Sequence, residues 1–165
     1  MTAPPGWLPE MISVSGEYHE VVARLYAIFE SDFKVARPRL GTLQVWWNKR
    51  ILPGGQYEEG FWHLITRTDG ATGDRLHDPR RAERLPWCGP TICHHVDPAV
   101  NAWDYKEARG KVRTYLWLEQ LDYVIILERR PTKSYGTVAF LVTAYHVDGE
   151  DTRRSLRQKF DRRCP

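Results

Sequence analysis

The sequence contains no apolar run that approaches the ~20 residues a membrane-spanning helix needs. Its start, MTAPPGWLPE, also lacks the basic and apolar regions of a secretory signal peptide. These two absences argue against membrane and secreted proteins. We therefore expect a cytoplasmic protein without a membrane partner.

Cysteine is scarce, because the chain has only Cys88, Cys93 and Cys164 and contains no CxxC pair. An odd number of scattered cysteines predicts neither a disulfide framework nor a zinc site. His94 and His95 adjoin Cys93 and superficially resemble a metal cluster. Side chains of adjacent residues diverge on a strand, however, and no second ligand pair follows at a finger-like spacing. The sequence thus predicts no metal and no other cofactor.

The motifs of several large enzyme classes are missing as well. The chain has no P-loop, no Rossmann glycine fingerprint, no HExxH and no nucleophile elbow. Nucleotide hydrolysis, dinucleotide chemistry, zinc proteolysis and ordinary serine hydrolysis therefore lose support. Catalysis would have to use scattered side chains. RNA cleavage is such a reaction, because the 2′-hydroxyl is an internal nucleophile and the enzyme supplies only a general base, a general acid and cations around the phosphorane.

Aromatic residues are abundant, in contrast, at 12% of 165 residues with seven tryptophans. This richness is typical of stacking surfaces or of aromatic core anchors. Positive charge is concentrated near the C-terminus: residues 151–163 contain six Arg or Lys and two Asp, which leaves 18 basic against 19 acidic residues elsewhere. Such a distribution is expected of an element that contacts phosphates.

The N-terminal half predicts helices and strands in alternation. Apolar residues at helical spacing predict a helix from Glu17 to about Ser31. Leu43–Trp47 and Phe61–Thr66 are expected to be strands, separated by the turn-rich LPGGQYEEG, and a short helix over Asp78–Leu85 is expected to follow.

The clearest β signal lies between Val112 and Val147, where VRTYLWL, YVIILERR and GTVAFLVTAYHV predict a three-stranded antiparallel meander. A four-residue turn between the first two strands sets their register. The predicted cross-strand pairs are Trp117 with Val124, Tyr115 with Ile126, and Arg113 with Glu128.

Alternation along these strands separates two faces of the sheet. One face is nearly all apolar and is expected to be covered by helices: Val112, Thr114, Leu116, Leu118, Tyr123, Ile125, Leu127, Val138, Phe140 and Val142. In the simplest register of the second hairpin, the other face gains Ala139, Leu141, Thr143 and Tyr145. That face is a mixture of polar and aromatic residues suited to a ligand.

The predicted organisation is a flexible arm over residues 1–16, rich in proline and glycine, followed by one α+β domain over 17–165. An N-terminal helical portion packs on an antiparallel sheet, which consists of the C-terminal meander and one or two earlier strands. A short basic helix over 152–163 closes the chain, with Leu156 and Phe160 as its apolar stripe.

Four sequence blocks carry a resemblance to a known family: GFWHLITRTD, RAERLPWCGPTI, RTYLWLEQLDYVIILERR and GTVAFLVTAYHVDGEDTRRSLRQKF. Their order over roughly residues 60–163 resembles the barnase/EndoU/colicin/RelE-like (BECR-fold) nucleases of phages and mobile elements. That group has an early histidine, a helix, a β-meander ending in threonine or serine, and often a basic tail. Here Arg67 and Thr68 stand where many relatives have an Arg-His pair.

The resemblance implies a metal-independent endoribonuclease that cleaves RNA, such as tRNA or mRNA, by 2′-hydroxyl attack. A toxin of phage or mobile-element origin, with a cognate immunity protein or antitoxin as partner, is one form of such an enzyme. His63 would act as base or acid, with the other implied catalytic residues Arg113, Thr143 and Tyr145 around the scissile phosphate. The implied RNA-binding residues are Arg67, Tyr115, Arg153, Arg157 and Lys159.

Each implied catalytic residue also has a structural interpretation. A histidine in an apolar run fits a hydrogen-bonded core position, Arg113 faces Glu128 across the hairpin, and Thr143 and Tyr145 are good strand formers. The alternative function is therefore a non-catalytic module that keeps the nuclease-like fold and recruits RNA or a protein. The lack of a second histidine soon after His63 favours this alternative.

Overall fold

The computed structural model describes residues 3–165, in which helices and strands alternate along the chain. The helices are α1 (Tyr18–Phe29), α2 (Glu59–Ile65), α3 (Pro79–Glu83), α4 (Leu85–Cys93) and α5 (Gly149–Asp161), with a π-helical turn η1 (Glu30–Val35) and a 3-10 turn η2 (Glu119–Leu121). The strands are β1 (Arg39–Leu40), β2 (Leu43–Trp46), β3 (Thr66–Thr68), β4 (Arg75–His77), β5 (Asn101–Lys106), β6 (Val112–Leu118), β7 (Tyr123–Thr132) and β8 (Gly136–His146).

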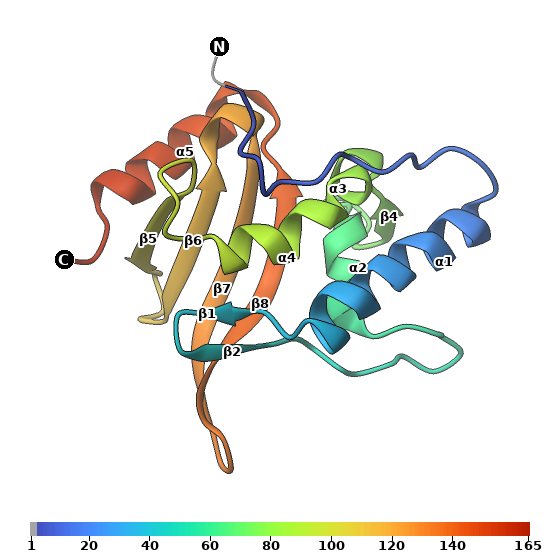
Figure 1. The fold of residues 1–165 in the computed structure, drawn as a ribbon, viewed down its shortest axis with the longest axis horizontal. Helices are drawn as coiled ribbons and strands as arrows, with labels where there is room; N and C mark the ends of the chain where they lie inside the picture. The colour runs from blue at the N-terminus through green and yellow to red at the C-terminus, as the bar shows by residue number, and fades with distance from the viewer. Residues whose placement is uncertain (1–2) are drawn as a thin grey trace.

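Six strands form one curled sheet in the order β1-β2-β8-β7-β6-β5, and β3 pairs with β4 separately (Figure 1). The predicted α+β class and the meander β6-β7-β8 are confirmed. The prediction of a wholly antiparallel sheet is wrong, because β2 runs parallel to β8. The sequence analysis also did not predict β5, which pairs with β6 and extends the meander at the edge away from β8.

The predicted strand over Phe61–Thr66 is a helix for most of its length. Phe61, Leu64 and Ile65 are fully buried, and their spacing of three and four residues places them on one face of α2. The hydroxyl of Thr66 donates to the carbonyl of Trp62 at 2.6 Å where α2 ends and β3 begins. So short an apolar run fits a strand and a buried helix equally, and packing against the sheet decides for the helix.

A β-bulge in the last hairpin decides which residues of β8 face the helices. All three predicted β6–β7 pairs are present, but the β7–β8 register shifts between Ile126 and Leu127. Thr143 and Tyr145 keep their predicted side because Ile126 opposes Thr143 and Val124 opposes Tyr145. Before the bulge the assignment is reversed: Ala139 and Leu141 are buried on the helix-covered face, and Val138 and Phe140 are on the other face.

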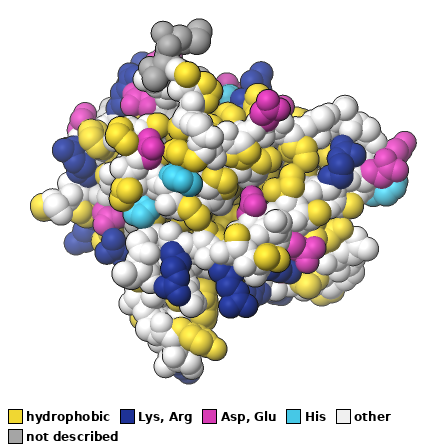
Figure 2. Space-filling model, viewed as in Figure 1, with side chains coloured by type: hydrophobic (Ala, Val, Ile, Leu, Met, Phe, Trp, Pro, Cys, Tyr) yellow, Lys and Arg dark blue, Asp and Glu magenta, His cyan; other side chains and the backbone are white. Residues whose placement is uncertain are grey.

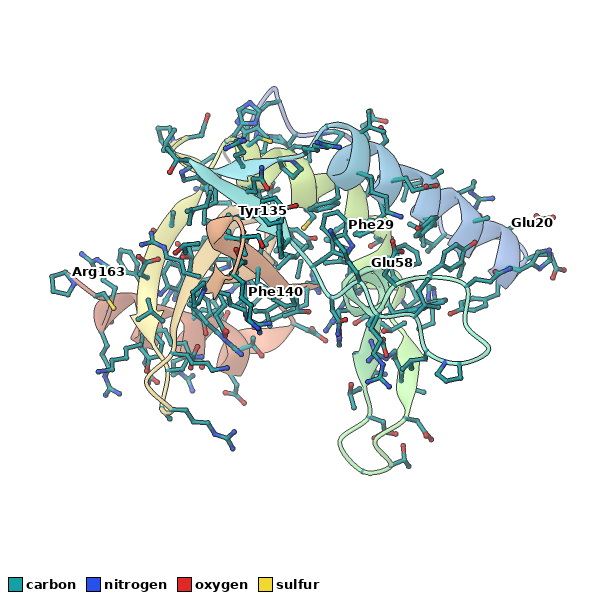
Figure 3. All side chains as sticks on the ribbon, turned by 90° about the horizontal axis from the view of Figure 1, so that it is seen from below. Glu20, Phe29, Glu58, Tyr135, Phe140 and Arg163 are labelled. Carbon is teal, nitrogen blue, oxygen red and sulfur yellow. The ribbon has the colours of Figure 1, made fainter. Side chains whose placement is uncertain are left out.

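The sheet separates two apolar clusters. The larger one lies between the sheet and helices α1, α2 and α4, and contains Phe29, Phe61, Leu85 and Ile125 among its buried members. The smaller one lies on the opposite face, which we call the outer face, where Leu156 of α5 packs with Trp103, Tyr115 and Trp117. Figures 1 and 3 show α5 on the side of the sheet opposite α1 and α4. The outer face is therefore covered by α5 near β5 and β6 and is more open near β8.

Residues 3–16 contain no regular element and run across the molecule toward α1 (Figure 1). Trp87 Nε1 donates to the Pro9 carbonyl at 2.8 Å, and the Ile12 amide donates to the Glu83 carbonyl at 3.0 Å. Among residues 3–165, no helix combines the length and the apolarity required to cross a membrane.

Gly60, near the start of α2, lies close against Trp47 and Asn48, the two residues that follow β2. A Cβ atom there would lie 2.8 Å from Trp47 Cβ and 3.1 Å from the Asn48 carbonyl oxygen. We expect Gly60→Ala to lower the free energy of unfolding by about 1–3 kcal/mol through overpacking, despite the better helix propensity of alanine. Urea denaturation measures the change. Gly70→Ala is the matched control, because nothing lies within 4 Å of its Cβ position; equal stabilities of the two variants would contradict the tight contact.

Candidate functional site

Arg81 brings His63 together with Thr143 and Tyr145, which lie about 80 residues further along the sequence. Its Nη1 donates to the carbonyl oxygen of His63 at 3.0 Å and to the hydroxyl of Thr143 at 3.4 Å. Its guanidinium carbon lies 5.5 Å from the centre of the Tyr145 ring. The structure thus places three of the four expected catalytic residues around one arginine.

Helix α3 sets the position of this arginine. Asp78 caps the helix by accepting a hydrogen bond from the Arg81 amide at 3.1 Å, and Pro79 occupies the first helical position. The Asp78 carboxylate also lies 3.7 Å from Arg81 Nε. Burial lowers the pKa of Arg81 from its usual value, yet an arginine remains charged at any ordinary pH. Its Nε is buried without a hydrogen-bond partner among residues 3–165.

Beside Arg81 is a pocket of about 470 Å³ between α3, the end of β8 and the start of α5, lined by Arg67, Asp78, Arg80, Arg81, Tyr145, His146, Asp148 and Thr152. Three arginines outnumber two aspartates in this arginine pocket. Arg67 and Arg80 are exposed and make no ion pair within residues 3–165. Their guanidinium groups are free to bind an anion such as a phosphate.

His63 is half-buried at the end of α2, and its Nδ1 lies 3.3 Å from Nη1 of Arg75. Burial is the main reason that its pKa is lowered, and the positive charges of Arg75 and Arg81 lower the pKa further against the opposing charge of Glu59. The imidazole is therefore neutral at neutral pH. The contacts with Arg81 and Thr143, however, use the backbone carbonyl of His63 and leave the ring outside them.

His146 is a pocket residue that the sequence analysis missed. Burial and the charges of Arg84 and Arg80 lower its pKa. Alternation places it on the face of β8 opposite Tyr145, so the strand pattern gave no reason to group the two. Both line the pocket because it opens at the end of the strand.

Arg113 is on the outer face but is separated from Thr143 by the whole of β7. Its Nε donates to the Glu128 carboxylate at 3.1 Å, as its cross-strand position predicts. Glu128 is 3% exposed and also binds Arg130 at 2.8 Å and Lys111 at 3.7 Å. Burial favours the protonated carboxyl, but the hydrogen bonds from Arg130 and Arg113 prevail and hold its pKa below the usual value. The structure thus assigns Arg113 to this ion-pair cluster.

Tyr115 is 1% exposed and stacks on Trp103, with ring centres 5.1 Å apart, under the C-terminal part of α5. Its hydroxyl donates to the Glu107 carboxylate and accepts a hydrogen bond from Lys159 Nζ at 2.9 Å. Burial raises the pKa of Tyr115 far above its usual value. Tyr115 and Lys159 are therefore partners in the contact between α5 and the sheet, and the Tyr115 ring has no open surface for RNA.

The other expected RNA-binding residues of α5 also contact the chain itself. Arg153 pairs with Asp122, and Arg157 donates to Glu119 at 3.1 Å. Together with Lys159 beside Glu107, these contacts match three cations of the basic helix with three carboxylates outside it. Carboxylates of the same chain therefore pair with part of the positive charge that the sequence concentrates near the C-terminus.

Within residues 3–165, no three His, Cys, Asp or Glu side chains lie close enough together to share a metal ion. Comparisons with known proteins add no relative: no family model, no curated protein and no solved structure matches the chain.

The lowered pKa values of His63 and His146 can be measured separately. We expect the imidazoles of His63 and His146 to titrate below pH 6.5 in NMR spectra, because burial disfavours the charged ring. Arg75→Gln should raise the His63 midpoint and leave that of His146, whereas Arg80→Gln should do the reverse. A midpoint at or above 6.5 in the parent, or equal responses to both substitutions, would contradict this electrostatic arrangement.

Stability should follow the same titrations. The folded chain favours the neutral rings, so the stability they contribute is present above pH 6.5 and is lost as the pH falls through the lowered folded-state pKa values.

Proposed function

We propose that the chain is a metal-independent endoribonuclease whose active site is the arginine pocket with His63, Thr143 and Tyr145. The observation that carries the proposal is the convergence of these three residues on Arg81, next to Arg67 and Arg80, which have no ion-pair partner within residues 3–165. Arginines without carboxylate partners suit a ligand that brings its own negative charge. RNA provides such a charge at every phosphate.

The reaction needs a proton acceptor and a proton donor, and both are present at neutral pH. The lowered pKa of His63 keeps its imidazole neutral, so it can accept the proton of the 2′-hydroxyl. Burial raises the pKa of Tyr145 despite the neighbouring Arg81, so its phenol remains protonated and can donate to the leaving 5′-oxygen. The 2′-oxygen forms a bond to phosphorus as the bond to the 5′-oxygen breaks, which yields a 2′,3′-cyclic phosphate and a 5′-hydroxyl.

The phosphate itself would bind to the guanidinium groups. Arg81 is held rigidly by two hydrogen bonds and the Tyr145 ring, which suits a group that stabilises charge on a pentacoordinate phosphorus without reorganising. Arg67 and Arg80 are exposed at the pocket's rim and would bind the flanking phosphates. The substrate is tRNA or mRNA in this proposal, and an immunity protein or antitoxin would act by covering the same pocket.

One observation favours a second function, a non-catalytic RNA-binding module. The His63 ring is next to Arg75, and only its backbone carbonyl contacts Arg81 and Thr143. If the ring does not reach the 2′-hydroxyl, the arginine pocket binds a phosphate without cleaving the chain.

Incubation with total RNA in excess EDTA tests the two functions directly. We expect the purified protein to produce fragments with 2′,3′-cyclic phosphate ends, since the mechanism uses no bound ion. His63→Ala should reduce the rate by ~100-fold or more, because general base catalysis contributes about that much. Tyr145→Phe should also slow cleavage, because it removes the proton donor and keeps the ring beneath Arg81. His19→Ala is the control, since His19 is exposed on α1 and does not line the arginine pocket.

Circular dichroism of each variant separates lost chemistry from lost folding. No product from the parent, with RNA still bound, would establish the binding module instead. Cleavage that appears only after Mg2+ or Zn2+ is added would overturn the metal-independent mechanism.

The salt dependence of RNA binding identifies the cations that contact phosphates. Each contact with single-stranded RNA adds ~0.7 to the slope of log affinity against log salt. We expect Arg67→Gln and Arg80→Gln each to flatten that slope by ~0.7, and Arg157→Gln to leave it unchanged because Arg157 already pairs with Glu119. Flattening by Arg157→Gln alone would instead place RNA on α5.

A further inference from the structure

A second, larger pocket lies away from the arginine pocket, between η1, β2 and the turn that joins β7 to β8. It has a volume of about 740 Å³, and its lining includes Arg37, Arg39, Trp46, Trp47, Lys49 and Tyr135. Cations and aromatic rings thus line one pocket, although they come from three separate parts of the chain. We call it the tryptophan pocket.

Three of the four cations that line this pocket lack anionic partners. Arg37, Arg39 and Lys49 are exposed and make no ion pair within residues 3–165. The only carboxylate in the lining, Glu58, is already paired with Lys34 at 2.6 Å and accepts a hydrogen bond from Tyr26. Figure 2 shows Lys and Arg side chains gathered low on the molecule, where Figure 1 places β1 and β2. The pocket therefore has a positive charge that nothing in the described chain neutralises.

Tyr135 and Trp46 are the accessible aromatic rings of the pocket. Tyr135 is 70% exposed and lies edge-to-face with Trp46, the ring centres 5.5 Å apart. The Lys49 ammonium lies 5.3 Å from the Trp46 ring centre and 5.1 Å from that of Trp47. A large ring exposed at a hairpin turn gains nothing from the core, so its surface remains available for a ligand.

The tryptophan pocket and the arginine pocket are connected by β8. Trp46 is opposite Phe140 in the sheet, so it is on the outer face with Thr143 and Tyr145. Figure 3 shows Tyr135 and Phe140 near the centre of the molecule seen from below. Nine residues along β8 separate Gly136 from Tyr145, or roughly 30 Å at ~3.3 Å per residue. A substitution in one pocket therefore does not touch the other.

We propose that the tryptophan pocket binds a single-stranded segment of polynucleotide, with a base stacked on Tyr135 beside Trp46 and the flanking phosphates bound by Arg37, Arg39 and Lys49. Stacking platforms beside unpaired cations are the two features that single-strand binding requires. The proposed nuclease function supplies only the choice of RNA as the polymer, since binding here needs no cleavage. An acidic peptide would use the cations but not the open ring, and a duplex would hide the faces of its bases.

Fluorescence anisotropy with a labelled 2′-O-methyl oligouridylate of about eight nucleotides tests this site. The probe has no 2′-hydroxyl to act as nucleophile, so cleavage plays no part in the result. The background variant is Arg80→Gln, which weakens the arginine pocket. In that background Tyr135→Ala should weaken binding about 5- to 100-fold, because a base stacked on an aromatic ring contributes ~1–3 kcal/mol. Tyr135→Phe should retain the affinity, since it retains the ring.

Three comparisons complete the experiment. Lys49→Gln should flatten the salt slope by ~0.7, whereas Lys133→Gln, in the same turn but outside the pocket lining, should not. An abasic probe of equal length should respond to Lys49→Gln and not to Tyr135→Ala. Tyr18→Ala, which removes an exposed ring on α1, should have no effect.

Equal affinities of the parent and Tyr135→Ala would overturn the proposal, as would an equal loss with the abasic probe. Competition by duplex or by an acidic peptide as effective as that by the single strand would also overturn it. The nuclease proposal would be overturned by a different result, the absence of RNA fragments after incubation in EDTA, so the two proposals can fail independently.

Discussion

The buried guanidinium of Arg81 is the interaction on which the candidate site depends. It joins α2 through the His63 carbonyl, α3 through its own backbone and β8 through Thr143. Its Nη1 is satisfied by the His63 carbonyl and the Thr143 hydroxyl, whereas its Nε has no hydrogen-bond partner within residues 3–165 and lies 3.7 Å from the Asp78 carboxylate. These contacts hold together the elements that carry His63, Thr143 and Tyr145 beside the arginine pocket. Fold and site share one constraint here.

The protein has two sets of cations, which differ in whether neighbouring carboxylates pair with them. On α5, Arg153, Arg157 and Lys159 each have an acidic partner outside the helix, and Leu156 anchors the helix to the outer face. Exposed ion pairs contribute ~1 kcal/mol or less each, so they orient this helix more than they hold it. Five exposed cations in the linings of the two pockets, in contrast, make no ion pair within residues 3–165: Arg67 and Arg80 in one, and Arg37, Arg39 and Lys49 in the other. Charge density in the sequence is thus a poor guide to phosphate binding unless the partners are known.

Features that depend on local interactions could be predicted from the sequence, whereas features that depend on contacts between distant residues could not. The β6–β7 register was predictable because a short turn and alternating side chains fix it locally. The helix α2, the bulge that reverses Ala139 and Leu141, and the parallel β2–β8 pair all depend on distant contacts. The same holds for the site: His63, Thr143 and Tyr145 were named from the sequence, but Arg81, which connects them, and His146 were not. Nothing in the local pattern of Arg81 indicates burial.

The absence of a second histidine near His63 does not deprive the site of an acid–base pair, because burial affects the two available groups in opposite senses. Burial disfavours the charged form of any side chain, so it removes the proton from an imidazole and retains the proton on a phenol. In the proposed mechanism His63 is the acceptor and Tyr145 the donor for the same physical reason, and at the same pH. The nearby arginines reinforce the first effect and oppose the second, yet the phenol begins from so high a pKa that it remains protonated. In the proposed mechanism, partial burial of each group thus prepares the proton acceptor and the proton donor that phosphodiester cleavage requires.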